Sequence, residues 1–138
     1  MNICSGQCKY IIAIYELGIL KNNKPVRSID IAQHLGVTRP SVSKMLKRMS
    51  CNGFIEEDCS QKVILTAEGL ETAKGLYYRY RMLYMFFRRV LHESKENAKS
   101  QAVLFLSTFS SDTSEKLSEV MEKNLERSRA RRQQTLSA

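Results

Sequence analysis

The stretch that decides the fold is "SIDIAQHLGVTRPSVSKMLKRMSCNGFIEEDCSQKVILT", residues 28–66. Ser28 is expected to cap a short helix that Gly36 closes, and Thr38 is expected to cap the next helix, with Pro40 in its first turn. Apolar residues in that next helix recur at i, i+3, i+4 and i+7, which gives one buried stripe made of Val42, Met45, Leu46 and Met49. Two short helices joined by a tight turn predict a helix-turn-helix.

The residues that follow the second helix predict a β-hairpin. "FIEED" and "KVIL" are rich in strand-forming residues and flank the turn residues "CSQ". A hairpin directly after a helix-turn-helix is typical of a wing. The order and the exposed cations together indicate a winged helix-turn-helix.

Helical segments surround this unit on both sides. Apolar spacing predicts a helix over about 5–22, and Thr66 is expected to cap a long helix. That long helix has its apolar stripe at Leu70, Ala73, Tyr77, Tyr80, Tyr84, Phe87 and Leu91. Two more helices are expected, at about 95–110 with Ala98, Ala102, Phe105 and Phe109 inward, and at about 113–132 behind a capping box of Asp112 and Glu115. The residues after 132 are expected to be frayed.

These elements define the predicted fold class and domains. The fold is mainly α with a small β-hairpin. A winged helix-turn-helix DNA-binding domain spans residues 1–71, and a helical dimerisation domain spans residues 72–138.

Charge points to a polyanionic partner. The 138 residues carry a formal net charge of +8, and the segment 39–48 holds four cations and no anion. A second basic cluster, "RSRARR", lies at 127–132. There is no glycine-rich phosphate loop and no Ser/His/Asp set, so the chain is not expected to be an enzyme.

The remaining composition indicates a cytoplasmic protein. The apolar run "LYMFFRRVL" is broken by two arginines, so no membrane span is expected. The start of the chain shows no export signal. The four cysteines form no CxxC pair and are expected to be reduced.

The residues expected to contact DNA lie on the second helix of the helix-turn-helix, at its start, and at the hairpin tip. Arginine and lysine suit phosphate oxygens and guanine edges, and short hydroxyl side chains allow close approach of the backbone. The predicted set is Arg27, Ser28, Thr38, Arg39, Pro40, Ser41, Ser43, Lys44, Lys47, Gln61 and Lys62.

Several of these motifs together resemble a known family. The segments are "YIIAIYEL", "IDIAQHLGV", "PSVSKMLKRM", "GFI", "LTAEG" and "YRYRMLYMFF". They resemble the diphtheria-toxin-repressor and manganese-transport-regulator family of metal-dependent bacterial repressors. The resemblance implies a homodimer whose winged helices read the major groove, with bound Mn(II) or Fe(II) orienting them for DNA.

The same resemblance places the family's metal ligands at positions that have changed here. Two carboxylate positions of the first helix hold Lys9 and Ile12. The histidine position of the long helix holds Tyr80, and the cluster on the following helix falls on Gln101, Leu104 and Phe105. Because Mn(II) and Fe(II) prefer carboxylate and imidazole, the prediction is that no metal is bound there and that no cofactor is needed. Lys9 either replaces the dication with its own charge beside Tyr80 or points to water.

The predicted function is a sequence-specific DNA-binding transcriptional regulator, acting as a repressor and a homodimer. The expected partners are double-stranded DNA and a second copy, which packs through Leu104, Phe105 and Phe109. One alternative is a winged-helix regulator of the multiple-antibiotic-resistance type, switched by a small apolar ligand or by oxidation of Cys4 and Cys8. Another is a DNA-independent interaction protein.

Overall fold

The structure is a computed structural model that describes residues 3–137, and it divides into two compact units. The N-terminal unit extends to Tyr77 and the C-terminal unit begins at Tyr78. This division lies a few residues beyond the expected domain boundary at 71. The helix α4 (Ala67–Arg89) contributes residues to both units.

The sequence predicts one continuous helix over about 5–22, and the structure divides this stretch into three helical segments. A 3-10 turn (Ser5–Gln7) leads into α1 (Cys8–Ile14), and a π-helix (Tyr15–Asn22) follows. The wider turn lets the Gly18 carbonyl accept the N–H groups of both Asn23 and Lys24. Residues 10–14 are buried, so α1 forms the centre of the N-terminal core.

The helix-turn-helix is formed by α2 (Ser28–Leu35) and α3 (Arg39–Cys51). Gly36 adopts a left-handed conformation with φ of +66° at the end of α2, as predicted. The Thr38 hydroxyl accepts the Ser41 N–H, which confirms the predicted cap of α3. The Ser28 prediction is wrong by one residue, because Arg27 occupies the N-cap and Ser28 is already helical.

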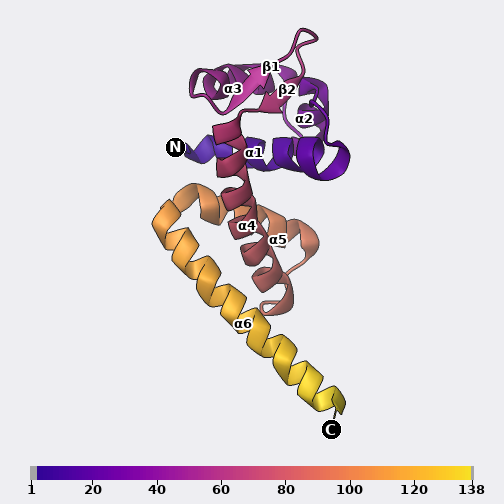
Figure 1. Ribbon diagram of the computed structural model, residues 1–138, viewed down its shortest axis with the longest axis vertical. Coiled ribbons are helices and arrows are strands. Elements are labelled where there is room, and N and C mark those ends of the chain that lie inside the picture. Colours follow the sequence, from indigo (N-terminus) through magenta and orange to yellow (C-terminus); the bar gives the residue numbers. More distant parts are fainter. Residues whose placement is uncertain (1–2, 138) are drawn as a thin grey trace. The chain divides into compact units, whose positions relative to one another are not determined.

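The wing is an antiparallel hairpin of β1 (Ile55–Glu57) and β2 (Val63–Leu65), as Figure 1 shows beside α3. Ile55 pairs with Leu65, and Glu57 pairs with Val63. Val26 adds a bridge on the other side of β2, with two backbone hydrogen bonds to Val63 of 2.7 and 2.8 Å. The residue that precedes the helix-turn-helix is therefore tied to the wing.

The start of α4 is joined tightly to the start of the wing. The Thr66 hydroxyl donates to the Gly53 carbonyl at 2.6 Å and accepts the Gly69 N–H at 2.9 Å. A Cβ placed on Gly69 would lie 2.0 Å from the Phe54 carbonyl oxygen. Because that neighbour is backbone, the contact leaves no room for any side chain at Gly69.

Gly69→Ala should therefore lower the free energy of unfolding, by about 1–3 kcal/mol or more, as expected for an overpacked site. Gly75→Ala is a matched control, since Gly75 is an exposed glycine of the same helix. That control should raise the free energy of unfolding by about 0.5–1 kcal/mol through helix propensity. Denaturant unfolding of the two variants measures both effects, and equal stabilities would contradict the close approach.

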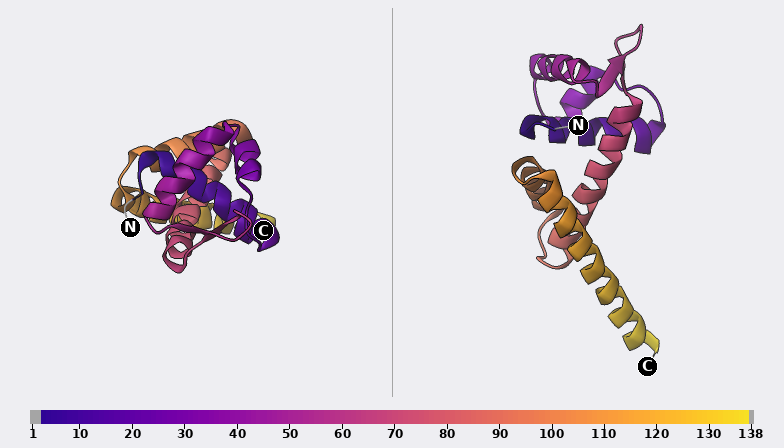
Figure 2. Two further views of the ribbon diagram at one scale, coloured as in Figure 1. Left: turned by 90° about the horizontal axis from the view of Figure 1, so that it is seen from above. Right: turned by 60° about the vertical axis from the view of Figure 1, so that its left-hand side comes forward.

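The C-terminal unit contains the second part of α4, together with α5 (Lys95–Thr108) and α6 (Ser111–Ser137). The predicted capping box of Asp112 and Glu115 is wrong, because the Ser110 hydroxyl accepts the Thr113 N–H and Asp112 pairs with Lys116. Nor does α6 end near 132, since it continues as a helix to Ser137. Figure 2 shows this helix extending past the end of α4.

The buried face of this unit differs from the prediction at its aromatic residues. Ala98 and Ala102 are buried as predicted, but Leu106 takes the next inward position and Phe109 is 48% exposed. In the part of α4 that belongs to this unit, Tyr80 and Leu83 are buried, whereas Tyr84 and Phe87 are only half-buried. Leu91 lies outside α4 and is exposed. Within residues 3–137, no helix combines the length and apolar character that a membrane span requires.

Candidate nucleic-acid interface

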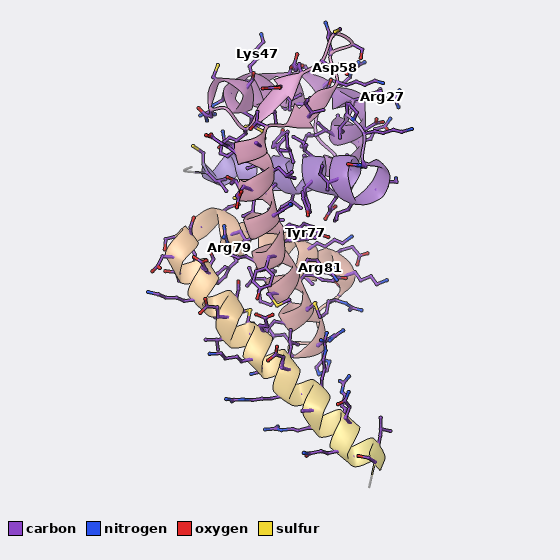
Figure 3. The ribbon with its side chains drawn as sticks, in the orientation of Figure 1. Arg27, Lys47, Asp58, Tyr77, Arg79 and Arg81 are labelled. Atoms are coloured by element: carbon purple, nitrogen blue, oxygen red, sulfur yellow. The ribbon has the colours of Figure 1, made fainter. Side chains whose placement is uncertain are left out.

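The outer face of α3 gathers the predicted DNA-contacting cations. Val42, Leu46 and Met49 face the core, so Arg39, Lys44 and Lys47 lie on the exposed side with Ser43. Figure 3 shows Lys47 projecting from this helix. Within residues 3–137, none of these three cations pairs with a carboxylate. Their charges are therefore available to an external anion.

The beginning of α3 adds a second attraction for anions. Thr38, Arg39, Pro40 and Ser41 are all exposed there. The first N–H groups of a helix carry partial positive charge, which favours phosphate. Thr38 and Ser41 are not independent donors, because their hydroxyls lie 2.8 Å apart within the cap.

The wing tip is held by Asp58, a residue that the sequence reasoning did not select. One carboxylate oxygen accepts the N–H and hydroxyl of Ser60, each at 2.9 Å, and the Lys62 N–H at 2.8 Å. The Lys62 bond, followed by the Ser60 bonds, lowers the pKa of Asp58 below its usual range. Gln61 takes a left-handed conformation with φ of +59° and is exposed at the tip. The sequence "DCS" could have indicated this turn, because an aspartate two residues before a serine often accepts its N–H.

Arg27 and Ser28 differ from the other predicted DNA-contacting residues. The Arg27 guanidinium donates to both carboxylate oxygens of Asp30, at 2.9 and 3.1 Å, and this hydrogen bonding raises the pKa of Arg27. Ser28 is half-buried. The structure thus places the other predicted residues on α3 and the wing tip, and it shows a local partner for Arg27.

Asp58→Ala should loosen the wing tip without lowering the melting temperature of the domain. Amide hydrogen exchange at Ser60 and Lys62 should become faster, because both lose their acceptor. Glu57→Ala, an exposed change on the adjacent strand, should leave those two amides protected.

The same contact predicts a pH dependence. The lowered pKa means that the carboxylate supports the tip above the ordinary aspartate pKa of about 3.9. This support should be lost as the pH falls through the lower pKa of the folded state. An NMR titration of the Ser60 and Lys62 amides that shows a midpoint at or above 3.9 would contradict the assignment.

In the N-terminal unit, the positions that the resemblance assigns to metal ligands hold Lys9 and Ile12. Ile12 is 5% exposed and belongs to the core. Lys9 is exposed, and its ammonium lies 5.7 Å from the centroid of the Tyr10 ring. Neither residue offers a carboxylate.

In the C-terminal unit, the corresponding positions are Tyr80, Gln101, Leu104 and Phe105. Tyr80 is buried, Gln101 is exposed, and Phe105 is half-buried. Leu104 is 59% exposed, and the ring of Phe105 stacks on that of Phe109 with centroids 4.0 Å apart. These side chains supply an amide, a phenol and apolar surface, which do not fit a hard divalent ion.

Other donor groups are sparse in the part of the chain that the structure describes. Residues 3–137 contain no group of three or more His, Cys, Asp or Glu side chains that could hold a metal ion. His34 Nε2 lies 3.1 Å from Glu16 Oε2, which makes a pair only. Over the same residues the four cysteines form no disulfide, and Cys4 is exposed while Cys8 is buried.

Comparison with known proteins finds relatives of the N-terminal part of the chain. Residues 7–67 match the family model described as iron dependent repressor, N-terminal DNA binding domain. Transcriptional regulator MntR of Escherichia coli is 41% identical over 76 residues, which cover 55% of this chain and 48% of that protein. The N-terminal part of the chain therefore resembles the DNA-binding domain of the iron-dependent repressors.

Other relatives extend the similarity beyond the N-terminal unit. An HTH-type transcriptional regulator of Methanocaldococcus jannaschii, MJ0568, is 26% identical over 114 residues, covering 83% of this chain and 90% of that protein. The manganese regulator SloR superposes with a TM-score of 0.72 at 24% identity, over 91% of this chain and 55% of that one. The family fold is thus a winged helix-turn-helix. The chain spans about half the length of the MntR and SloR proteins that it matches. The relatives from Escherichia coli and Methanocaldococcus jannaschii are named as transcriptional regulators and SloR as a manganese regulator, and none of the three is named as an enzyme.

The comparisons overturn the prediction that no cofactor is involved. ScaR with bound Zn²⁺ matches with a TM-score of 0.63 and 25% identity, over 84% of this chain and 53% of that one. The prediction rested on residue types at six positions, and it is wrong because members of the family bind divalent metals as regulatory cofactors. The six positions themselves offer no carboxylate and no imidazole to such an ion.

Proposed function

We propose that the chain is a DNA-binding transcriptional repressor that acts as a homodimer and responds to a divalent metal. The observation that carries the proposal is the outer face of α3. Within residues 3–137, it presents Arg39, Lys44 and Lys47 without carboxylate partners, next to a wing whose tip is already hydrogen-bonded. In this motif the second helix lies in the major groove and its first residues contact bases.

The residues of α3 divide by the part of DNA that each suits. Arg39, at the helix start, reaches base edges or the nearest phosphate, and Lys44 and Lys47 contact the phosphate backbone. Ser43 permits close approach between them. Gln61 and Lys62 extend the contact to the flanking backbone from the wing. The relatives named above do not favour a regulator of the multiple-antibiotic-resistance type.

Replacing Lys44 and Lys47 together by alanine should weaken DNA binding across all sequences. Each lost phosphate contact lowers the slope of log affinity against log salt by about 0.9, so the slope should fall by about two. Lys21→Ala with Lys24→Ala is the matched control, because it removes the same charge from exposed residues of the same unit. Fluorescence anisotropy over a salt series measures both, and an unchanged slope in the first variant would exclude α3 as the reading helix.

The dimer proposal rests on the apolar face of α5. Leu104 and Phe109 are both about half exposed or more, and Phe105 stacks on Phe109 beside them. Large apolar side chains exposed together at the end of a helix favour burial against a partner. A second copy fits this face, because a two-fold interface uses the same patch on both subunits.

Leu104→Glu should convert the dimer to a monomer, since the charge enters a symmetric interface twice. The exposed position of Leu104 within the protomer means that folding itself should be little affected. Val120→Glu is the control, because Val120 is a comparably exposed apolar residue on α6. Sedimentation velocity decides the matter: a dimeric Leu104→Glu variant, or a monomeric Val120→Glu variant, would place the interface elsewhere.

The proposed response to a divalent metal is supported by the relatives SloR, a manganese regulator, and ScaR, which has been solved with bound Zn²⁺. Mn(II) should raise the affinity for operator DNA at least tenfold over protein held in chelator, and Mg(II) at the same concentration should not. Anisotropy titrations with and without chelator measure this effect. Equal affinity under all three conditions would show that this chain lacks a response to metal.

A further inference from the structure

The last part of α6 carries a high concentration of positive charge. Residues 127–137, termed here the distal arm, contain four arginines and no aspartate or glutamate. The formal net charge of the whole chain is +8, so this segment accounts for half of it. All four arginines are exposed, and within residues 3–137 none of them forms an ion pair. The distal arm is therefore an open cationic surface.

The distal arm is helical although it buries no side chain. Leu125 is the last buried residue of α6, and residues 126–137 are all exposed. The helix nevertheless continues to Ser137, and Figure 2 shows it beyond the end of α4. A short helical segment that is polar on every face has little to stabilise it in water, because most helical stability comes from packing. A partner that contacts this segment would supply the stabilisation that the core does not.

The spacing of the arginines opposes the helix. Arg127 and Arg131 lie four residues apart on one face, where like charges repel each other. At 3.6 residues per turn this face lies about 200° around the helix from Leu125, which is buried. No carboxylate lies three or four residues from either arginine. Glu126 precedes Arg129 by three residues and can offset that charge, but it lies about 100° around the helix from Arg127. A polyanion would relieve the repulsion between Arg127 and Arg131.

We propose that the distal arm binds the phosphate backbone of duplex DNA, as a contact additional to that of α3. This proposal rests on the proposed function, because it extends DNA binding to a second element. A guanidinium group matches phosphate oxygens with two N–H groups at once. A helix that lies along a groove has phosphates on both sides. Arg132 lies about 140° around the helix from Arg127, so the arm directs cations toward both strands.

The composition of the distal arm favours DNA over a membrane. Leu136 is its only large apolar residue, so the arm has no apolar face to enter a lipid interface. An acidic protein surface has the same sign of charge as DNA. The experiment therefore includes an acidic polypeptide as a second probe.

Replacing Arg127 and Arg131 together by glutamine tests the proposal in the full chain. The matched control replaces Lys95 and Lys99 by glutamine, because these two lysines are also exposed and four residues apart, on α5. Circular dichroism verifies that both variants keep their helices. The probes are a random-sequence DNA duplex several helical turns long and polyglutamate.

Fluorescence anisotropy over a salt series should show a smaller slope of log affinity against log salt in the arginine variant. Each lost phosphate contact lowers this slope by about 0.9, so the expected fall is about two for each protomer bound. The lysine control should keep the slope of the parent chain. In the parent chain, duplex DNA should also slow amide hydrogen exchange over residues 127–137.

An unchanged slope in the arginine variant, an equal fall in both variants, or unchanged amide exchange over residues 127–137 would overturn the proposal. Weaker binding to polyglutamate with unchanged binding to DNA would also overturn it, because it would assign the distal arm to an acidic protein. The variant that lacks Lys44 and Lys47 separates this result from the proposed function. If that variant alone loses slope, α3 binds DNA and the distal arm does not. A parent chain that binds no duplex would overturn both proposals.

Discussion

The hydroxyl of Thr66 is the contact on which the N-terminal unit depends. It donates to the carbonyl of Gly53, at the end of the helix-turn-helix, and it accepts the N–H of Gly69 in the first turn of α4. One side chain therefore joins the exit of α3, the entry to β1 and the start of the long helix. The absence of a side chain at Gly69 is what allows the Phe54 carbonyl to come so near. The bridge between Val26 and Val63 closes the same arrangement from the other side of the hairpin.

Sequence reasoning was most accurate where structure is encoded locally. Gly36 and Thr38 were predicted correctly because a left-handed residue and a helix cap each depend on neighbours within a few positions. The hairpin was also predicted, but the hydrogen bonds that Asp58 accepts at its tip were not. The π-helix was not predicted, because residues 15–22 keep an apolar pattern that an α-helix would share. The predicted capping box was wrong because Ser110 and Asp112 are both good caps, and the helix begins at Ser111, directly after Ser110.

The candidate site was less completely predictable, because part of it depends on what each side chain touches. The cations of α3 follow from helical phase alone and lie where the sequence placed them. Arg27 was grouped with them by charge, but its partner Asp30 lies one turn away and engages it. Phe109 was expected to point inward and to pack against a second copy; within the protomer it is 48% exposed, and Leu106 is buried. The prediction that no metal is needed was drawn from the side chains at six positions. Those side chains show what each position can bind, but they do not show how the protein is regulated.

The closed tip of the wing has a consequence for the thermodynamics of recognition. A loop that orders only upon binding loses conformational entropy at that moment, and fixing each backbone residue opposes binding by about 1–2 kcal/mol. Here the carboxylate of Asp58 orders Ser60 and Lys62 while the chain folds, before any ligand arrives. The entropy loss then belongs to folding, and the wing meets its ligand as a rigid body. Association through such a tip should have a smaller unfavourable entropy than association through a floppy hairpin of the same length.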